Sequence, residues 1–145
     1  MNAIEFLKSQ HKEAKAGFQK LEQASEAQRG QLWKHLSPEL KLHEQMEQKC
    51  LYGPLSKDTH DPTLASWPDR HAGEVREAEQ LIAGIDRRSP GDREWLQDVK
   101  RLHSALDEHI REEEREIWPK VEKAWDGSRL EEAGQRMAAM KAEKR

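Results

Sequence analysis

The clearest helical pattern in the chain lies at residues 102–119, which read LHSALDEHIREEEREIWP. Steps of three and four residues connect its apolar positions, so these side chains share one stripe of a helix. His109 and Glu113 lie in the same stripe, and Pro119 is expected to bend the helix near its end. The segment therefore predicts a helix that turns two polar side chains toward a core. The full stripe is Leu102, Leu106, His109, Glu113 and Ile117.

Three segments upstream repeat this pattern of an apolar stripe that contains a histidine. His11 lies in the first, His43 and Glu47 in the second, and His71 in the third. Apolar and polar residues do not alternate over any useful length, so no β-strand is predicted. The sequence predicts an all-α, up-and-down four-helix bundle. The expected helices run from about residue 3 to the mid-twenties, from Leu32 to Cys50 before a loop at 53–62, from Leu64 to Ile85, and from about Asp92 onward.

Length and composition suit a single domain. A chain of 145 residues is long enough for one buried core. We expect residues 1–126 to form the bundle and residues 127–145 to form a short C-terminal helical tail, packed on the bundle or extending from it. Only 34% of the residues are apolar and 37% are charged, values that would also suit a disordered chain. The prediction that the chain is folded therefore rests on its helical periodicity.

Charge and hydropathy argue against several classes of partner. The net charge is −3, with acidic and basic residues interspersed, so nucleic acid is not an expected partner. No apolar run approaches the length of about 20 residues that spans a bilayer, and no membrane partner is expected. Cys50 is the single cysteine and cannot form an internal disulfide, which suits a reducing compartment. We therefore expect a cytoplasmic protein.

The four stripe histidines are expected at one height in the bundle. Two residues on successive antiparallel helices lie level when the turn between the helices is midway between them in sequence. The midpoints of the pairs His11–His43, His43–His71 and His71–His109 fall at residues 27, 57 and 90, each at or near an expected turn. Four imidazoles that face the core at one height form a cluster.

Two glutamates extend this cluster. The pairs His43–Glu47 and His109–Glu113 each place an imidazole and a carboxylate four residues apart, about 40° around a helix and about 6 Å along it. Burying two carboxylates beside four imidazoles is costly without a cation, and a metal would remove that cost. Mixed nitrogen and oxygen ligands suit iron or manganese, and also zinc. The alternative is a network of salt bridges without a metal.

These motifs resemble the signature segments of the hemerythrin-like HHE cation-binding domain family. They are HEQME at residues 43–47 and HIREEE at 109–114, the latter followed by Ile117-Trp118-Pro119. His11 and His71 fall where that family supplies ligands from its first and third helices, and the resemblance covers about residues 3–125. It implies two iron ions in an oxo- or hydroxo-bridged centre, with Glu47 and Glu113 as bridges. The implied ligands are His11, His43, Glu47, His71, His109 and Glu113.

One position departs from the family's pattern. Oxygen-carrying hemerythrins have a second histidine four residues after the first on the third helix, but this chain has Val75 there. The missing imidazole leaves a coordination position open and argues against simple reversible oxygen carriage. Glu44, which follows the histidine of the second helix, and Glu74 are candidates to fill it. We rank both below the six, because a solvated face is the more ordinary place for a glutamate.

The remaining histidines and the tryptophans are assigned no part in the site. His35, His60 and His103 lie beside the stripes or in a loop, so they are expected at the surface or behind the ligands. Four tryptophans are expected to pack in the core or at the ends of the bundle, and they are Trp67, Trp95, Trp118 and Trp125.

Four functions suit such a site. The preferred one is binding of oxygen, nitric oxide or peroxide for sensing, scavenging or delivery, and a sensor would need a separate protein partner. The second is a redox enzyme that acts on peroxide or nitric oxide, although no catalytic residue beyond the metal ligands is evident. The third is iron storage or homeostasis. The fourth is a structural metal, such as zinc, that stabilises a core poor in apolar residues.

Overall fold

The protein is helical over almost all of residues 1–143, the part that the computed structural model describes, and no strand occurs in that part. The last two residues of the expected tail, 144 and 145, lie outside it. None of the described helices combines the length and the apolar character needed to cross a membrane. The elements are α1 (Ala3–Gln23), α2 (Glu26–Glu47), η1 (Gln48–Tyr52), α3 (Gly53–Asp58), α4 (Pro62–Arg87), α5 (Arg93–Glu112), η2 (Glu113–Ile117), α6 (Trp118–Ala124) and α7 (Gly127–Glu143).

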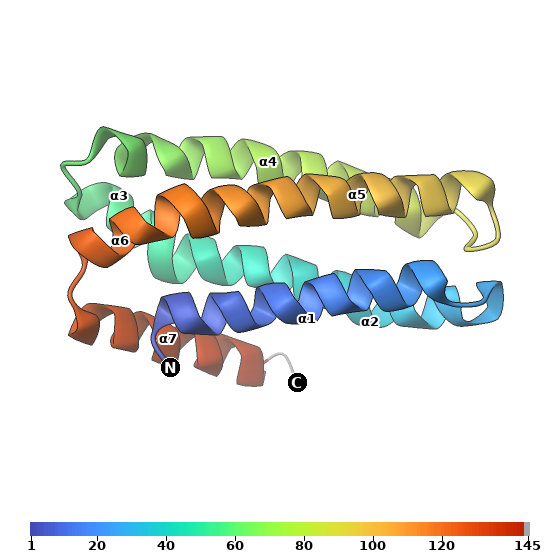
Figure 1. Cartoon of the computed structure of the whole chain (residues 1–145), viewed down its shortest axis with the longest axis horizontal. Coiled ribbons are helices and arrows are strands. Elements are labelled where there is room, and N and C mark those ends of the chain that lie inside the picture. The colour runs from blue at the N-terminus through green and yellow to red at the C-terminus, as the bar shows by residue number, and fades with distance from the viewer. Residues whose placement is uncertain (144–145) are drawn as a thin grey trace.

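The long helices α1, α2, α4 and α5 form an up-and-down bundle, which confirms the predicted fold class. In Figure 1, α1 and α2 lie together below α4 and α5, and the α1–α2 and α4–α5 turns are at the same end. The helix α1 begins with the capping box that its sequence predicts. Asn2 accepts a hydrogen bond from the Glu5 backbone, and the Glu5 side chain accepts one from the Asn2 backbone.

The C-terminal helix α7 packs along α1, as Figure 1 shows at the lower edge of the molecule. Its Gly134 allows a close backbone approach, because an added Cβ would lie only 2.3 Å from the carbonyl oxygen of Met1. The tail thus covers the start of the first helix and buries Met137 among the core residues of that end.

The core consists of two apolar clusters separated along the bundle. One cluster fills the end where α3, α6 and α7 lie, and it includes Leu7, Tyr52 and Trp118. The other fills the end near the α1–α2 turn, and it includes Phe18 and Trp95. The four tryptophans expected in the core are all buried there, at 5% exposure or less. Polar residues occupy the layer between the clusters.

Two π-helical turns, η1 and η2, follow the HxxxE pairs of α2 and α5. Each turn closes with a backbone hydrogen bond between residues five positions apart. Gly53 N–H donates to the Gln48 carbonyl, and Trp118 N–H donates to the Glu113 carbonyl. A proline comes next in both cases. Because a proline ring collides with the carbonyl four residues before it and has no N–H to donate, a wider turn before the proline avoids that contact.

The sequence did not predict these turns. The stretch 53–62 was expected to be a loop, but its first half is the helix α3, so the chain stays helical through Asp58. Gly53 and Pro54 begin this helix, because a proline at the first turn needs no hydrogen-bonded N–H. Pro119 similarly occupies the first turn of α6, directly after η2. The expected bend is therefore a change of helix type.

Candidate metal centre

The four predicted histidines lie in the polar layer between the two apolar clusters, one on each long helix. All are buried, with at most 9% of each exposed. The rings of His11 and His43 have centroids 4.9 Å apart, and those of His71 and His109 lie 5.1 Å apart. The layer predicted from sequence midpoints is therefore present as two neighbouring pairs of imidazoles.

Two fully buried carboxylates, those of Glu47 and Glu113, lie among these imidazoles. The Oε1 atom of Glu47 is 3.2 Å from His43 Nε2, 3.4 Å from His71 Nε2 and 3.9 Å from His109 Nε2. The Glu47 carboxylate therefore reaches imidazoles of both pairs, as a bridging ligand must.

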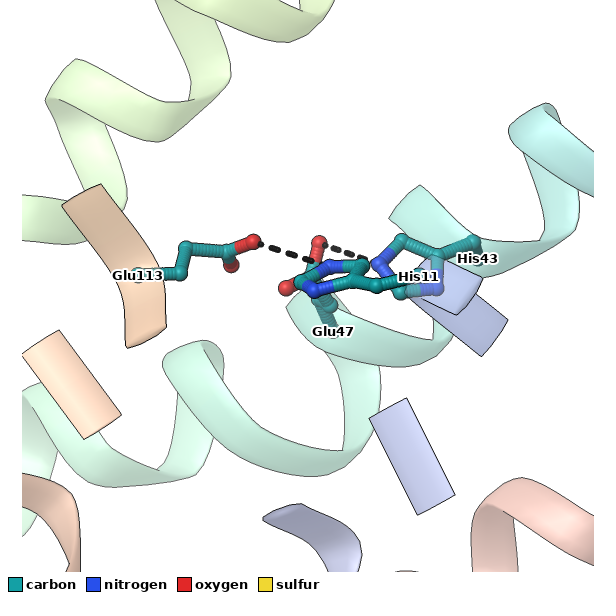
Figure 2. Close-up of side chains that lie close together, drawn as sticks. All are labelled: His11, His43, Glu47 and Glu113. Carbon is teal, nitrogen blue, oxygen red and sulfur yellow. Dashed lines mark ion pairs between the residues drawn. The ribbon is translucent and has the colours of Figure 1, made fainter. Parts of the chain in front are cut away.

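The carboxylate of Glu113 approaches from the opposite side of the bundle. Its Oε1 atom lies 3.4 Å from His11 Nε2 and 3.1 Å from His109 Nε2. Figure 2 shows this carboxylate directed at His11, with Glu47 and His43 beside it. All six predicted ligands are thus brought together, although that they bind metal stays a prediction.

The ligand atoms form two groups, each compact enough to surround one metal ion. The groups share Glu47, which lies between them. Each group offers two imidazoles and two carboxylates, a mixed nitrogen and oxygen donor set. The first group is His11, His43, Glu47 and Glu113, and the second is Glu44, Glu47, His71 and His109.

Glu44 belongs to the second group, although its sequence position suggested a solvated face. Its Oε2 atom lies 2.8 Å from His71 Nε2, and only 15% of its side chain is exposed. Glu44 directly follows His43, so α2 presents neighbouring residues to the two groups. Val75 has no ligand atom, and Glu44 offers a fourth possible ligand atom to the group that lacks a second α4 histidine.

The atoms that face the centre have no hydrogen-bond partner. An isolated buried polar atom is costly, and buried polar groups in proteins nearly always have a partner. Seven unpartnered buried atoms in one layer therefore form a donor set that suits a pair of metal ions. Within residues 1–143 these atoms are His11 Nε2, His43 Nε2, His71 Nε2, His109 Nε2, Glu44 Oε2, Glu47 Oε1 and Glu113 Oε1.

Three of the imidazoles are held from behind through Nδ1. A hydrogen bond from Nδ1–H to an oxygen fixes the ring and leaves Nε2 free to bind a metal, an arrangement common among metal-binding histidines. Glu74, whose expected place was a solvated face, contributes one of these oxygens. Gln10 and Glu114 were not predicted, since each lies next to a stripe position and has no motif of its own. The contacts are His11–Glu114 at 2.9 Å, His43–Gln10 at 2.7 Å and His109–Glu74 at 2.6 Å.

Tyr52 is a fully buried residue of the site that the sequence analysis missed. Its hydroxyl lies 3.3 Å from Glu47 Oε2 and also hydrogen-bonds Glu113 Oε2. The indole N–H of Trp118 donates to the Tyr52 oxygen at 2.9 Å. Trp118 also stacks on His11, with ring centroids 4.8 Å apart. The two aromatic residues therefore close the layer on the side of α3 and α6.

Comparison with known proteins identifies the family. The family described as Hemerythrin HHE cation binding domain matches residues 2–121 of the chain, which is most of its length. The chain belongs to the hemerythrin HHE cation-binding domain family. A crystal structure of a hemerythrin HHE cation-binding domain-containing protein, the Rv2633c homologue of Mycobacterium kansasii, is similar to it with a TM-score of 0.79. The two are 25% identical, and the match covers 98% of this chain and 86% of the other. A comparison with curated proteins gives no match.

The remaining histidines of this HHE domain lie away from the centre. His35 and His60 are exposed. His103 stacks on Phe18, and its Nδ1 lies 3.0 Å from a carboxylate oxygen of Glu22. None of the three belongs to either ligand group.

The buried carboxylates control the protonation of the imidazoles in the metal-free HHE domain. Burial alone would lower the pKa of His43, but the negative charge of Glu47 outweighs burial and raises that pKa to about 9. Burial also opposes protonation of His71, whereas the nearby carboxylates of Glu44 and Glu47 raise its pKa to about 10. Burial and the charge of Glu47 raise the pKa of Glu113. His43 and His71 are therefore protonated at neutral pH in the metal-free protein.

Metal binding should release protons. At pH 7.5 His43 and His71 carry protons in the metal-free protein, because their pKa values of about 9 and about 10 lie above that pH. A metal binds only the neutral imidazole, so both protons must leave, and the apparent metal affinity should rise as the pH approaches 9. Calorimetry of ferrous iron binding in buffers of different ionisation enthalpy measures the number released. A binding enthalpy that is independent of the buffer would contradict this prediction.

Proposed function

We propose that this HHE domain is a non-haem di-iron protein that binds oxygen or a related small ligand, such as nitric oxide or peroxide, for sensing, scavenging or delivery. The observation that supports it most is the set of unpartnered, buried nitrogen and oxygen atoms in two groups that share Glu47. Glu47 and Glu113 would bridge two ions, and the four histidines and Glu44 would complete the coordination. Iron bound there would supply redox chemistry and a position for an exogenous ligand.

The donor set favours iron within this proposal. Each group combines two imidazoles with two carboxylates, and such hard and intermediate donors suit iron or manganese better than a metal that selects thiolates. Zinc also accepts these ligands, so the element is decided by measurement. The single cysteine, Cys50, is buried and unpaired, and it belongs to neither group.

The polypeptide leaves room for a small ligand beside both groups. A cavity of about 260 Å³ between α1 and α2 reaches His11, His43 and His109. A second cavity, of about 630 Å³, lies between α2, α4 and α5 and borders Glu44, His71 and Val75. Both have mainly apolar walls, which favour uncharged ligands over ions. The position that would carry a second α4 histidine in an oxygen carrier therefore lines open space.

Spectroscopy of the reconstituted protein tests this function. Protein loaded anaerobically with ferrous iron should hold about two iron ions per chain, and its absorption spectrum should change when oxygen or nitric oxide is added. The Glu47→Ala variant, taken through the same procedure, provides the background of unbound iron. An unchanged spectrum with oxygen, nitric oxide and peroxide alike would exclude the proposed ligand binding.

The alternative is a redox enzyme that acts on peroxide or nitric oxide. The second cavity, of about 630 Å³, supports it, because a substrate in that space would lie beside Glu44 and His71. Sustained consumption of peroxide or nitric oxide, faster than with the same concentration of free iron, would select the enzyme. Rapidly exchangeable iron without ligand chemistry would indicate storage. A colourless zinc protein would indicate a structural metal.

Two further expectations belong to this proposal. We place the protein in the cytoplasm, where a single unpaired cysteine is compatible with the reducing environment. If the site senses its ligand, we expect a separate protein to receive the signal. Affinity capture with the ligand-bound and ligand-free forms would show whether such a partner exists.

A further inference from the structure

The hydroxyl of Tyr52 contacts the buried carboxylates of Glu47 and Glu113. In each carboxylate, one oxygen faces the imidazoles and the other faces Tyr52. The Oε1 atoms of Glu47 and Glu113 lie among the imidazoles and have no hydrogen-bond partner within residues 1–143. The Oε2 atoms of both lie at the Tyr52 hydroxyl. One phenol group therefore contacts both carboxylates at once, although they come from different helices.

We propose that Tyr52 is a positioning residue of the metal centre, whose hydroxyl holds Oε2 of Glu47 and Glu113 so that both Oε1 atoms face the imidazoles. This inference rests on the metal-binding part of the proposed function. It assigns Tyr52 no contact with the reacting ligand. Its role is to set how the two carboxylates present themselves to the ions.

The surroundings of Tyr52 fix its hydroxyl in place. Trp118 N–H donates to the phenol oxygen, and this bond directs the single hydroxyl proton toward the carboxylates. The Tyr52 ring lies edge-on to Trp67 and to His71, with centroids 5.9 Å and 4.9 Å away. With both its ring and its oxygen held, Tyr52 loses little further freedom when a metal binds, which is the condition for preorganisation.

The two π-helical turns bring Tyr52 and Trp118 to the carboxylates. Tyr52 is five residues after Glu47, and Trp118 is five residues after Glu113. In an α-helix a residue five positions later points about 140° away around the axis. Because η1 and η2 are wider turns, the residue five positions later comes back over the carboxylate. In both places a π-helical turn therefore brings an aromatic residue beside the carboxylate.

Substitution of Tyr52 by phenylalanine tests this role. Tyr52→Phe keeps the ring and removes the hydroxyl, so both Oε2 atoms lose their partner. Partners behind metal ligands typically contribute about 10- to 100-fold in metal affinity, and we expect a loss of about that size for ferrous iron in competition with a chromophoric chelator. The midpoint potential of the bound iron should also fall, because a hydrogen bond to a carboxylate ligand favours the ferrous state.

Two further variants separate positioning from packing. Trp118→Phe keeps an aromatic ring beside His11 but removes the donor to Tyr52, and it should shift affinity and potential in the same direction by a smaller amount. Trp95→Phe removes a comparable buried ring from the other apolar cluster, and it should lower the melting temperature without changing the potential.

The outcomes distinguish this inference from the proposed function. If the wild-type protein binds two iron ions and Tyr52→Phe has the same affinity and potential, the positioning role is wrong while the metal site stands. If Tyr52→Phe does not fold, Trp118→Phe carries the test, and wild-type values in that variant overturn the inference. A wild-type protein that binds no metal after reconstitution would instead remove the proposed function.

Discussion

The Glu47→Ala variant should lose both of the proposed metal ions, whereas Glu113→Ala should lose chiefly one. The difference follows from the two ligand groups, because Glu47 belongs to both, whereas Glu113 belongs to the group with His11 and His43 and reaches the other only at His109. Removing Glu47 leaves each group with three ligands. Removing Glu113 takes one bridge from the group that contains Glu44 and His71 but leaves its four other residues in place. Metal analysis of the purified, reconstituted variants measures the effect directly.

The Glu47→Ala variant should also be unstable without metal. Glu47 is fully buried, and interactions with His43, Glu113 and His109 hold the pKa of its carboxyl well below the ordinary value against the opposing effect of burial. Breaking a buried ion pair from one side typically costs about 3–5 kcal/mol, because the remaining charge has no partner. Chemical denaturation of the metal-free variant and wild type gives this difference. Full metal content in Glu47→Ala would exclude this residue as the shared ligand.

A matched control separates the site from its surroundings. Glu116 lies on the same π-helical turn as Glu113 but is exposed to solvent. Glu116→Ala should therefore keep both ions and change the free energy of unfolding by no more than about 0.5 kcal/mol, as is usual for exposed positions. Loss of metal in this variant would show that general disruption of η2 releases metal, without a specific role for Glu113.

Stripping the metal from the wild-type protein should lower its melting temperature by on the order of 10 °C. A ligand that binds only the folded state at a thousand times its dissociation constant stabilises that state by about 4 kcal/mol. For a chain of this size about 1 kcal/mol corresponds to roughly 3 °C. Removal also exposes the cost of the buried carboxylates and imidazoles. The expected change is large because the site lies in the middle of the core, between the two apolar clusters.

Paired thermal melts measure this effect. The protein is melted with metal, after chelation and after readdition of ferrous iron, which should restore the original value. Equal melting temperatures for samples that differ in measured metal content would show that the layer is stable by itself as a salt-bridge network.

The long helices and the histidine layer could be predicted because both depend on regular α-helical geometry. A period of 3.6 residues places His11 and His43 in apolar stripes, and turn positions set their heights. Burial of all four histidines at one level follows from these two facts alone. The second group was predicted less well. Glu44 was ranked below the main set because it lies one position outside the stripe of its helix. Only its contact with His71 in the structure places it in the second group.

Tyr52 could not be found by the same reasoning. A regular α-helix from Glu47 to Tyr52 would point the Tyr52 side chain away from Glu47. Only a π-helical turn returns it to the site, and the sole local signal is a proline shortly after each HxxxE pair. The outer partners Gln10 and Glu114 were missed for a different reason. They are ordinary polar residues next to a ligand position, and their value depends on the orientation of an imidazole.

The π-helical turns also restrict how this chain can change in length. A π turn corresponds to an α-helix that carries one additional residue, and each residue of an α-helix rotates the chain by about 100°. Deleting one residue from 48–52 would convert η1 into regular helix and turn Tyr52 and all of α3 relative to Glu47. The same holds for residues 113–117 and Trp118. Insertions and deletions are therefore expected to be rarer in these two short segments than substitutions at most of their individual positions.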